Sequence, residues 1–147
     1  MSIWWSLHLR REAASVPLAR RLLLGTMETV GVDPDISFDL SVALSEACAN
    51  AVEHGGGGGG PGRSEAYRVT AYLDGDRCRI EVTDSGPGFP PATVARHRPS
   101  LAEHGRGLHL IEELADHVRF RNRPGRGAVV SFDKTLKWRD GALLKVS

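Results

Sequence analysis

The chain has 147 residues, which suits one domain with a hydrophobic core of its own. It carries 19 basic and 18 acidic residues, so its charge gives no argument for binding nucleic acid or an anionic membrane. Residues 1–21 contain five charged side chains and no long apolar run, so we expect neither a signal peptide nor a membrane span. Cys48 lies in an apolar run and is expected to be a buried thiol rather than half of a disulfide, which suits a reducing cytoplasm.

The N-terminal part of the chain predicts one strand and two helices. Residues 3–9 alternate as a strand, and apolar residues then recur at helical spacing from Ser15, a suitable N-cap, to a terminating Gly31. Asp33 and Pro34 predict the start of a second helix that runs to about residue 54. Six consecutive glycines follow at 55–60. Because the pieces on either side are too short to fold alone, we interpret this run as a loop inside one domain.

The C-terminal part predicts two hairpins separated by a helix. Strands over 67–73 and 78–83 flank a turn at 74–76, and residues 90–103 are interpreted as a loop or a partly helical lid. A third helix over 107–115 precedes strands over 118–121 and 128–132, after which residues 136–147 extend the last strand and become a tail. This order predicts a two-layer α/β sandwich: a mixed sheet covered on one face by three helices.

The second helix combines a polar stripe with a largely apolar circumference. Steps of three and four residues align Asp39, Ala43, Glu46, Asn50 and Glu53. A buried polar group without a partner costs about 1–3 kcal/mol, so water or a ligand must meet this stripe. The stripe either faces water or forms a site in which Asn50 binds Mg²⁺ beside phosphates and Glu46 acts as a base. Mg²⁺ commonly takes one or two protein oxygens together with phosphate and water.

Asp84 follows an Ile-Glu-Val-Thr strand and precedes Gly86 and Gly88. These residues form either an ordinary glycine turn or a site for a purine base. In a purine site the carboxylate accepts a hydrogen bond from the exocyclic amine of adenine, and the glycines let the base come close.

A second pair of glycines opens the third helix at Gly105, Arg106, Gly107 and Leu108. The pair serves either as a flexible cap or as a phosphate site, because free N–H groups at a helix start attract anions. In a phosphate site Arg106 would add charge-assisted hydrogen bonds.

In this order the three blocks resemble the GHKL (Bergerat-fold) ATP-binding superfamily of gyrase, the heat-shock chaperone ATPases, MutL and the histidine kinases. The matching segments are Glu-Ala-Cys-Ala-Asn at 46–50, Asp-Ser-Gly-Pro-Gly at 84–88 and Gly-Arg-Gly at 105–107. The resemblance is closer to the anti-sigma-factor serine kinases of bacterial partner switching, through Asn-Ala-Val-Glu-His-Gly at 50–55 and the segment 105–116. It implies a histidine-kinase-like ATP-binding domain over residues 1–138, followed by a tail over 139–147.

The same resemblance implies ATP and Mg²⁺ as cofactors, with Asn50 on the metal, Asp84 on adenine, and Glu46 orienting or deprotonating the attacking hydroxyl. It implies a cytoplasmic serine/threonine kinase that sequesters a sigma factor and phosphorylates a STAS-type anti-anti-sigma antagonist. Arg20 and Arg21 of the first helix become candidates for the partner surface. Neither the particular sigma factor nor the antagonist is identified by the sequence, and a homodimer is left open.

A non-catalytic, ATP-binding regulator is the alternative to the kinase. Glu46 favours the kinase, because binding alone needs no base. A sensor histidine kinase is disfavoured because no helical hairpin with a phospho-accepting His precedes these blocks, and gyrase-like hydrolysis because no second domain follows to supply a catalytic Lys.

Overall fold

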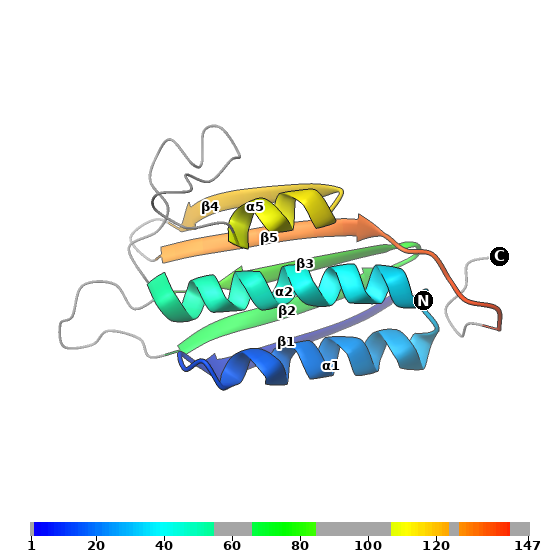
Figure 1. Ribbon diagram of the computed structural model, residues 1–147, viewed down its shortest axis with the longest axis horizontal. Helices are drawn as coiled ribbons and strands as arrows, with labels where there is room; N and C mark the ends of the chain where they lie inside the picture. The colour runs from blue at the N-terminus through cyan, green and yellow to red at the C-terminus, as the bar shows by residue number, and fades with distance from the viewer. Residues whose placement is uncertain (1, 55–65, 85–106, 124–126, 142–147) are drawn as a thin grey trace.

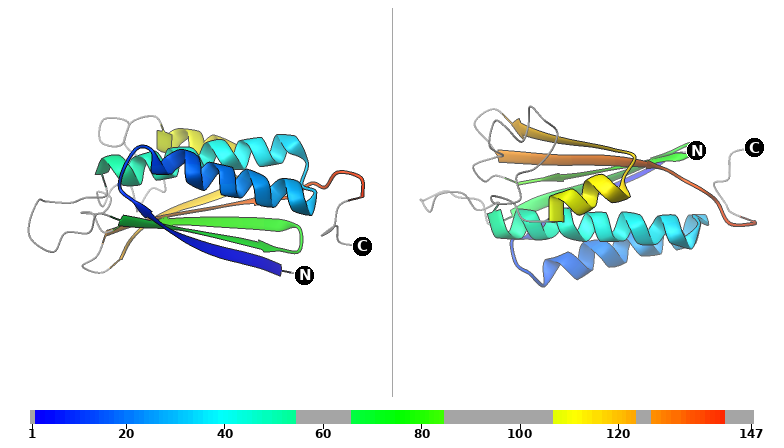
Figure 2. Two further views of the ribbon diagram at one scale, coloured as in Figure 1. Left: turned by 90° about the horizontal axis from the view of Figure 1, so that it is seen from below. Right: turned by 45° about the horizontal axis from the view of Figure 1, so that its top comes forward.

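The structure is a computed structural model, which describes residues 2–54, 66–84, 107–123 and 127–141. In chain order its elements are β1 (Ser2–Arg10), α1 (Ser15–Val30), α2 (Pro34–His54), β2 (Ala66–Asp74), β3 (Arg77–Thr83), α5 (Gly107–Leu114), β4 (His117–Arg123) and β5 (Gly127–Thr135). The three helices lie in one layer on one face of the sheet (Figures 1 and 2). The predicted element order and the two-layer α/β sandwich are therefore confirmed.

The five described strands are ordered β1-β2-β3-β5-β4, and every neighbouring pair is antiparallel. The expected mixed sheet is therefore wrong for these strands. Two helices connect β1 to β2, so the chain returns to the end where β1 stops and β2 runs back beside it. Strands β3 and β4 do point the same way, but β5 lies between them and prevents a parallel pair.

The core lies between the sheet and the helices, as the side-chain alternation requires. Along β3, Cys78, Ile80 and Val82 are buried while the residues between them are more exposed. On α2, Leu40 and Leu44 pack into the same core with almost no exposure. Each such large apolar side chain contributes about 1.5–3 kcal/mol when fully buried. This shared core fixes the position of α2 over the centre of the sheet.

The start of α1 differs from the prediction. Ala14, not Ser15, occupies the N-cap, and Ser15 is the first helical residue. The Ser15 hydroxyl donates to the Glu12 carbonyl at 2.7 Å and is also hydrogen-bonded to the Tyr67 hydroxyl. A tertiary partner on β2 has therefore replaced the local capping bond that the sequence suggests.

The junction between α1 and α2 forms as predicted. Gly31 ends α1 in the left-handed conformation, with φ of 92°, and its N–H donates to the Met27 carbonyl at 3.0 Å. The Asp33 carboxylate then accepts the N–H of Asp35 at 2.8 Å, which caps α2. None of the described helices is both long and apolar enough to cross a membrane.

Strand β5 ends at Thr135 instead of continuing as expected, and the chain then crosses to the helical layer. Leu136 is buried, and Trp138 forms an isolated bridge with Val32. The Arg139 guanidinium donates to the Glu28 carbonyl at 2.7 Å. These contacts attach the segment after β5 to the end of α1.

Candidate functional site

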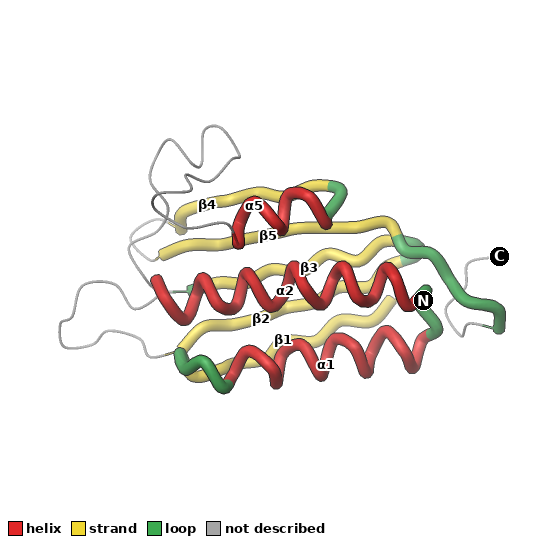
Figure 3. Tube along the Cα trace, viewed as in Figure 1, coloured by secondary structure: helices red, strands yellow, loops and turns green. Residues whose placement is uncertain are grey.

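The predicted site residues that the structure describes come from elements that meet at one end of the sandwich. The C-terminal half of α2, the end of β3 and the start of α5 lie there together (Figure 3). The structure describes five of the predicted residues: Glu46, Asn50, Asp84, Gly107 and Leu108. The other four, Gly86, Gly88, Gly105 and Arg106, lie outside the described residues.

Asn50 is buried on α2, with 8% of its surface exposed. Its carboxamide oxygen Oδ1 has no hydrogen-bond partner within the part of the chain that the structure describes. A buried oxygen in this state costs about 1–3 kcal/mol unless something binds it, so a ligand of opposite polarity is favoured here. An amide oxygen is a suitable ligand for Mg²⁺, so the predicted metal role of Asn50 fits its surroundings.

Glu46 lies one helical turn before Asn50 and contacts the start of α5. A Cβ atom built on Gly107 would stand only 2.6 Å from the Glu46 carboxylate oxygen Oε2. The φ of Gly107 is not positive, so its backbone conformation does not require glycine. The close approach of Glu46 nevertheless means that any larger residue at this position would push the Glu46 carboxylate out of its observed place. The structure thus brings these two predicted site residues into contact, a pairing that the sequence analysis missed because nothing in the spacing links them.

Asp84 is the first residue after β3 and is 7% exposed. Its N–H donates to the Ala128 carbonyl at 3.0 Å, and its Oδ1 accepts the Ala128 N–H at 3.3 Å. This double link to the start of β5 fixes the orientation of the carboxylate. A buried and oriented carboxylate can read a hydrogen-bond donor on a ligand, as the adenine role requires. The contribution of Ala128 had no signal in the sequence.

The polar stripe of α2 does not share one environment. Ala43 and Asn50 are buried, Glu46 is intermediate and Glu53 is exposed. Asp39 lies near the Lys134 ammonium, at 4.0 Å. Water therefore meets the stripe at Glu53, whereas Glu46 and Asn50 face the interior end of the site.

Leu108 is fully buried and belongs to the hydrophobic core. Its side chain therefore packs α5 against α2, and any contact with a nucleotide would come from its backbone. This packing keeps Gly107, the preceding residue, against Glu46.

Thiol chemistry is disfavoured at both cysteines of the chain. Both cysteines are buried and unpaired as thiols, as predicted for Cys48. Burial raises the pKa of the Cys48 thiol to about 12, and that of Cys78 to about 12 as well. Both stay protonated at neutral pH, and a protonated thiol is a poor nucleophile.

The fold is that of an ATPase domain, as a comparison with known families shows. Residues 9–134 match the histidine kinase-like ATPase domain, and the chain belongs to this family. Membership of an ATPase family implies that the chain uses ATP.

Two curated relatives have names that describe a more specific function than the family name does. The chain is 35% identical to the anti-sigma F factor of Pasteuria penetrans over 113 residues, which cover 72% of this chain and 74% of the relative. It is 31% identical to the serine-protein kinase RsbW of Bacillus subtilis over 140 residues, which cover 83% and 86% of the two chains.

Solved structures support the fold. A crystal structure of the RsbU and RsbW domains of a Mycobacterium tuberculosis protein covers 97% of this chain with a TM-score of 0.65 at 24% identity, and this chain spans 35% of that one. The nucleotide-free catalytic domain of the histidine kinase ThkA covers 92% of this chain with a TM-score of 0.56 at 14% identity. At these identities the likeness concerns the fold alone.

Proposed function

We propose that the chain is a cytoplasmic, ATP-dependent anti-sigma factor that sequesters a sigma factor and phosphorylates a serine or threonine of a STAS-type anti-anti-sigma antagonist. The relatives named as an anti-sigma factor and a serine-protein kinase support this class. The observation that carries the kinase part is the pair of Glu46 and Asn50 on α2. The Glu46 carboxylate lies against Gly107, one turn from the Asn50 oxygen that has no partner among the described residues. A regulator that only bound ATP would need no base at that position.

Each predicted residue has a role in this proposal. Glu46 orients or deprotonates the attacking hydroxyl of the antagonist, a contribution that is typically worth about 10²–10⁴-fold in rate. Asn50 holds Mg²⁺, which when bound neutralises charge on the phosphates. Asp84 binds the adenine amine. We assign binding of the base and phosphates to Gly86, Gly88, Gly105, Arg106, Gly107 and Leu108, and a single domain to residues 1–138.

The exposed side of α1 supports a partner surface there. Arg20 and Arg21 are exposed, and Leu18 and Leu22 expose 52% and 40% of their surfaces. A groove of about 650 Å³ runs along α1 beside Ile3 of β1. Exposed leucines next to arginines are suited to binding a protein.

The test measures transfer of labelled γ-phosphate from ATP to a candidate antagonist protein. We expect the wild type to transfer phosphate. The Glu46→Ala variant should bind ATP as tightly as the wild type but should not transfer phosphate. Glu53→Ala is the matched control, because it removes an exposed carboxylate from the same helix. We expect Glu53→Ala to behave as the wild type.

Undiminished transfer by Glu46→Ala would place the base elsewhere. If the wild type binds ATP but transfers no phosphate to any antagonist, the chain is a non-catalytic regulator and not a kinase.

A further inference from the structure

The face of the sheet opposite the helices is covered by no described helix (Figure 2). Cross-strand pairing brings distant residues into rows on this open face, because neighbours in register point the same way. One row joins Trp4, Tyr72, Arg79, Asp133 and His117 across all five strands. A second row contains Glu81 of β3, Ser131 of β5 and Arg119 of β4.

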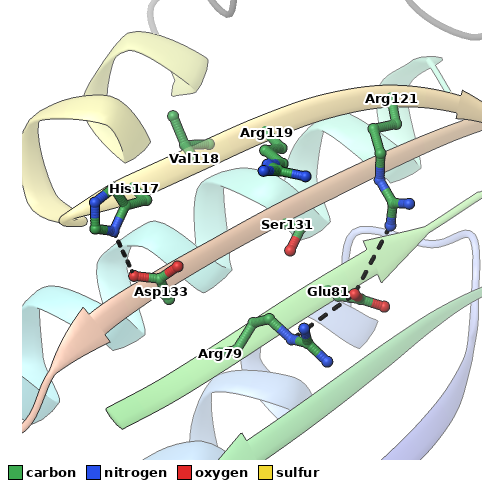
Figure 4. Close-up of a pocket in the computed structure, with 8 residues that line it drawn as sticks. All are labelled: Arg79, Glu81, His117, Val118, Arg119, Arg121, Ser131 and Asp133. Carbon is green, nitrogen blue, oxygen red and sulfur yellow. Dashed lines mark hydrogen bonds and ion pairs between the residues drawn. The ribbon is translucent and has the colours of Figure 1, made fainter.

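A hollow of about 730 Å³ lies on this face over β3, β4 and β5. Figure 4 shows three arginines around it, with the Glu81 carboxylate between two of them. Arg79 and Arg121 approach Glu81 at 3.9 and 3.8 Å. Arg119 lies beside Ser131 and has no ion-pair or hydrogen-bond partner among the described residues.

The charges on this face do not balance. Asp133 is shared by the Arg77 guanidinium and by His117, whose Nδ1 lies 2.9 Å from it. Among the strand residues of this face whose side chains the structure describes, five arginines (Arg68, Arg77, Arg79, Arg119 and Arg121) oppose three carboxylates (Asp74, Glu81 and Asp133), a surplus of +2 with histidines not counted. Arg10 is left out because the Glu12 carboxylate lies 3.8 Å from it. The whole chain has a net charge of only +1. Positive charge is thus concentrated here, which favours a negatively charged partner.

Aromatic side chains extend the same face toward β1. Trp4 exposes 67% of its surface, and the Arg79 guanidinium lies 4.6 Å from the centre of the Tyr72 ring. A second hollow of about 460 Å³ lies over Trp4 and Tyr72 and shares Arg79 and Asp133 with the first. Trp, Tyr and Arg are the residue types most enriched at the energetic centres of protein interfaces.

We propose that this open face is a docking surface for an acidic segment of a partner protein. The carboxylates of that segment pair with Arg119 and with the arginines around Glu81, and its apolar side chains contact Trp4 and Tyr72. A second copy of the chain would place the same positive surplus against itself. A nucleic acid would bring its continuous phosphate charge against Glu81 and Asp133 at the centre of the face. Discrete carboxylates on a protein segment avoid both conflicts.

This surface goes beyond the proposed function, because it uses neither the nucleotide site nor α1. Both of those belong to the helical layer and its end (Figure 1). A partner held on the open face would leave the nucleotide site accessible.

The probe is a peptide of alternating Glu and Tyr with blocked termini, about eight residues long. An extended peptide of this length crosses five strands, because neighbouring strands lie roughly 4.8 Å apart and each extended residue spans roughly 3.3 Å. The full chain, labelled with ¹⁵N, is titrated with this peptide and followed by NMR. We expect the perturbed amides to lie in all five strands, because the peptide contacts Trp4 of β1 and Tyr72 of β2 as well as the arginines of β3 and β4. Arg119→Glu should weaken binding roughly three- to tenfold, since the pairs are solvent-exposed.

Lys137→Glu is the matched control: it makes the same change in net charge at an exposed residue beyond the end of β5. We expect it to keep the affinity within about twofold, because charges beyond a Debye length are screened. Unchanged affinity of both variants for ATP verifies that they are folded.

Four results would overturn the proposal. They are equal binding of a Gln-for-Glu peptide, perturbations confined to α1, an equal loss with Lys137→Glu, and tighter binding of a single-stranded oligonucleotide at the same amides. The last result would make the face a nucleic-acid surface instead.

Discussion

Replacing Gly107 by alanine separates the position of the Glu46 carboxylate from the stability of the fold. The new Cβ would stand 2.6 Å from Oε2 of Glu46, but 3.5 Å from its Cδ and 3.6 Å from its Cβ. Only the terminal oxygen clashes, so rotation of the Glu46 side chain relieves the contact. That rotation costs about 0.5–1.5 kcal/mol, and the gain from Ala over Gly in a helix is up to about 1 kcal/mol. We therefore expect the free energy of unfolding in urea to change by no more than about 1 kcal/mol.

Phosphate transfer responds differently, because the carboxylate must move by several tenths of an ångström or more. A misplacement of about 1 Å costs on the order of a hundredfold in rate, so single-turnover transfer by Gly107→Ala should fall by about that factor. Glu46→Asp has a shorter side chain that leaves room for the new methyl group. In the Glu46→Asp background, Gly107→Ala should therefore lower the rate of phosphate transfer by a clearly smaller factor than in the wild type. The same fold loss in both backgrounds would show that Gly107 does not act through Glu46.

Three further outcomes follow from the structure. Asp84→Asn should weaken ATP binding severalfold or more, since a hydrogen bond to a charged group contributes about 1.5–3 kcal/mol; equal affinity in calorimetry would remove the adenine assignment. The N–H of Thr135 donates to the Asp116 carboxylate at 2.7 Å and holds the pKa of that carboxyl below its ordinary value. The stability that this carboxylate contributes is present above its unfolded pKa of about 3.9 and is lost as the pH falls through its folded pKa. In urea unfolding, the difference in free energy of unfolding between the wild type and Asp116→Asn should therefore shrink below about pH 4. A difference that stays constant with pH would contradict this. Cys48 and Cys78, with pKa values raised to about 12 by burial, should react with iodoacetamide only after unfolding, and fast native labelling of either would contradict their burial.

The sequence predicts most of this fold because local signals agree with tertiary packing. Gly31 ends α1 and Asp33 caps the start of α2, as expected. The turn at Gly75, with φ of 61°, joins the two predicted strands. Ser15 was assigned wrongly as a cap because its partner is Tyr67, far along the chain. The mixed sheet failed for a similar reason, since the place of β5 between β3 and β4 depends on long-range pairing.

In the candidate site, too, the local pattern was predicted from the sequence and the contacts between distant segments were not. The spacing on α2 identified Glu46 and Asn50, and the structure adds what surrounds each of them. The contact of Glu46 with Gly107 joins two helices, so no periodicity could show it. The arginines of the open face were missed because alternation along β3 and β4 predicts a polar face without saying that its charges are unbalanced.

The account depends most on the buried end of α2 as the place where the metal-bound nucleotide is held. Calorimetry of ATP binding with and without Mg²⁺, on the wild type and Asn50→Ala, tests this directly. We predict that Mg²⁺ increases the affinity of the wild type for ATP, and that this increase is largely lost in Asn50→Ala. An equal effect of Mg²⁺ on both proteins, or no ATP binding by the wild type, would contradict it.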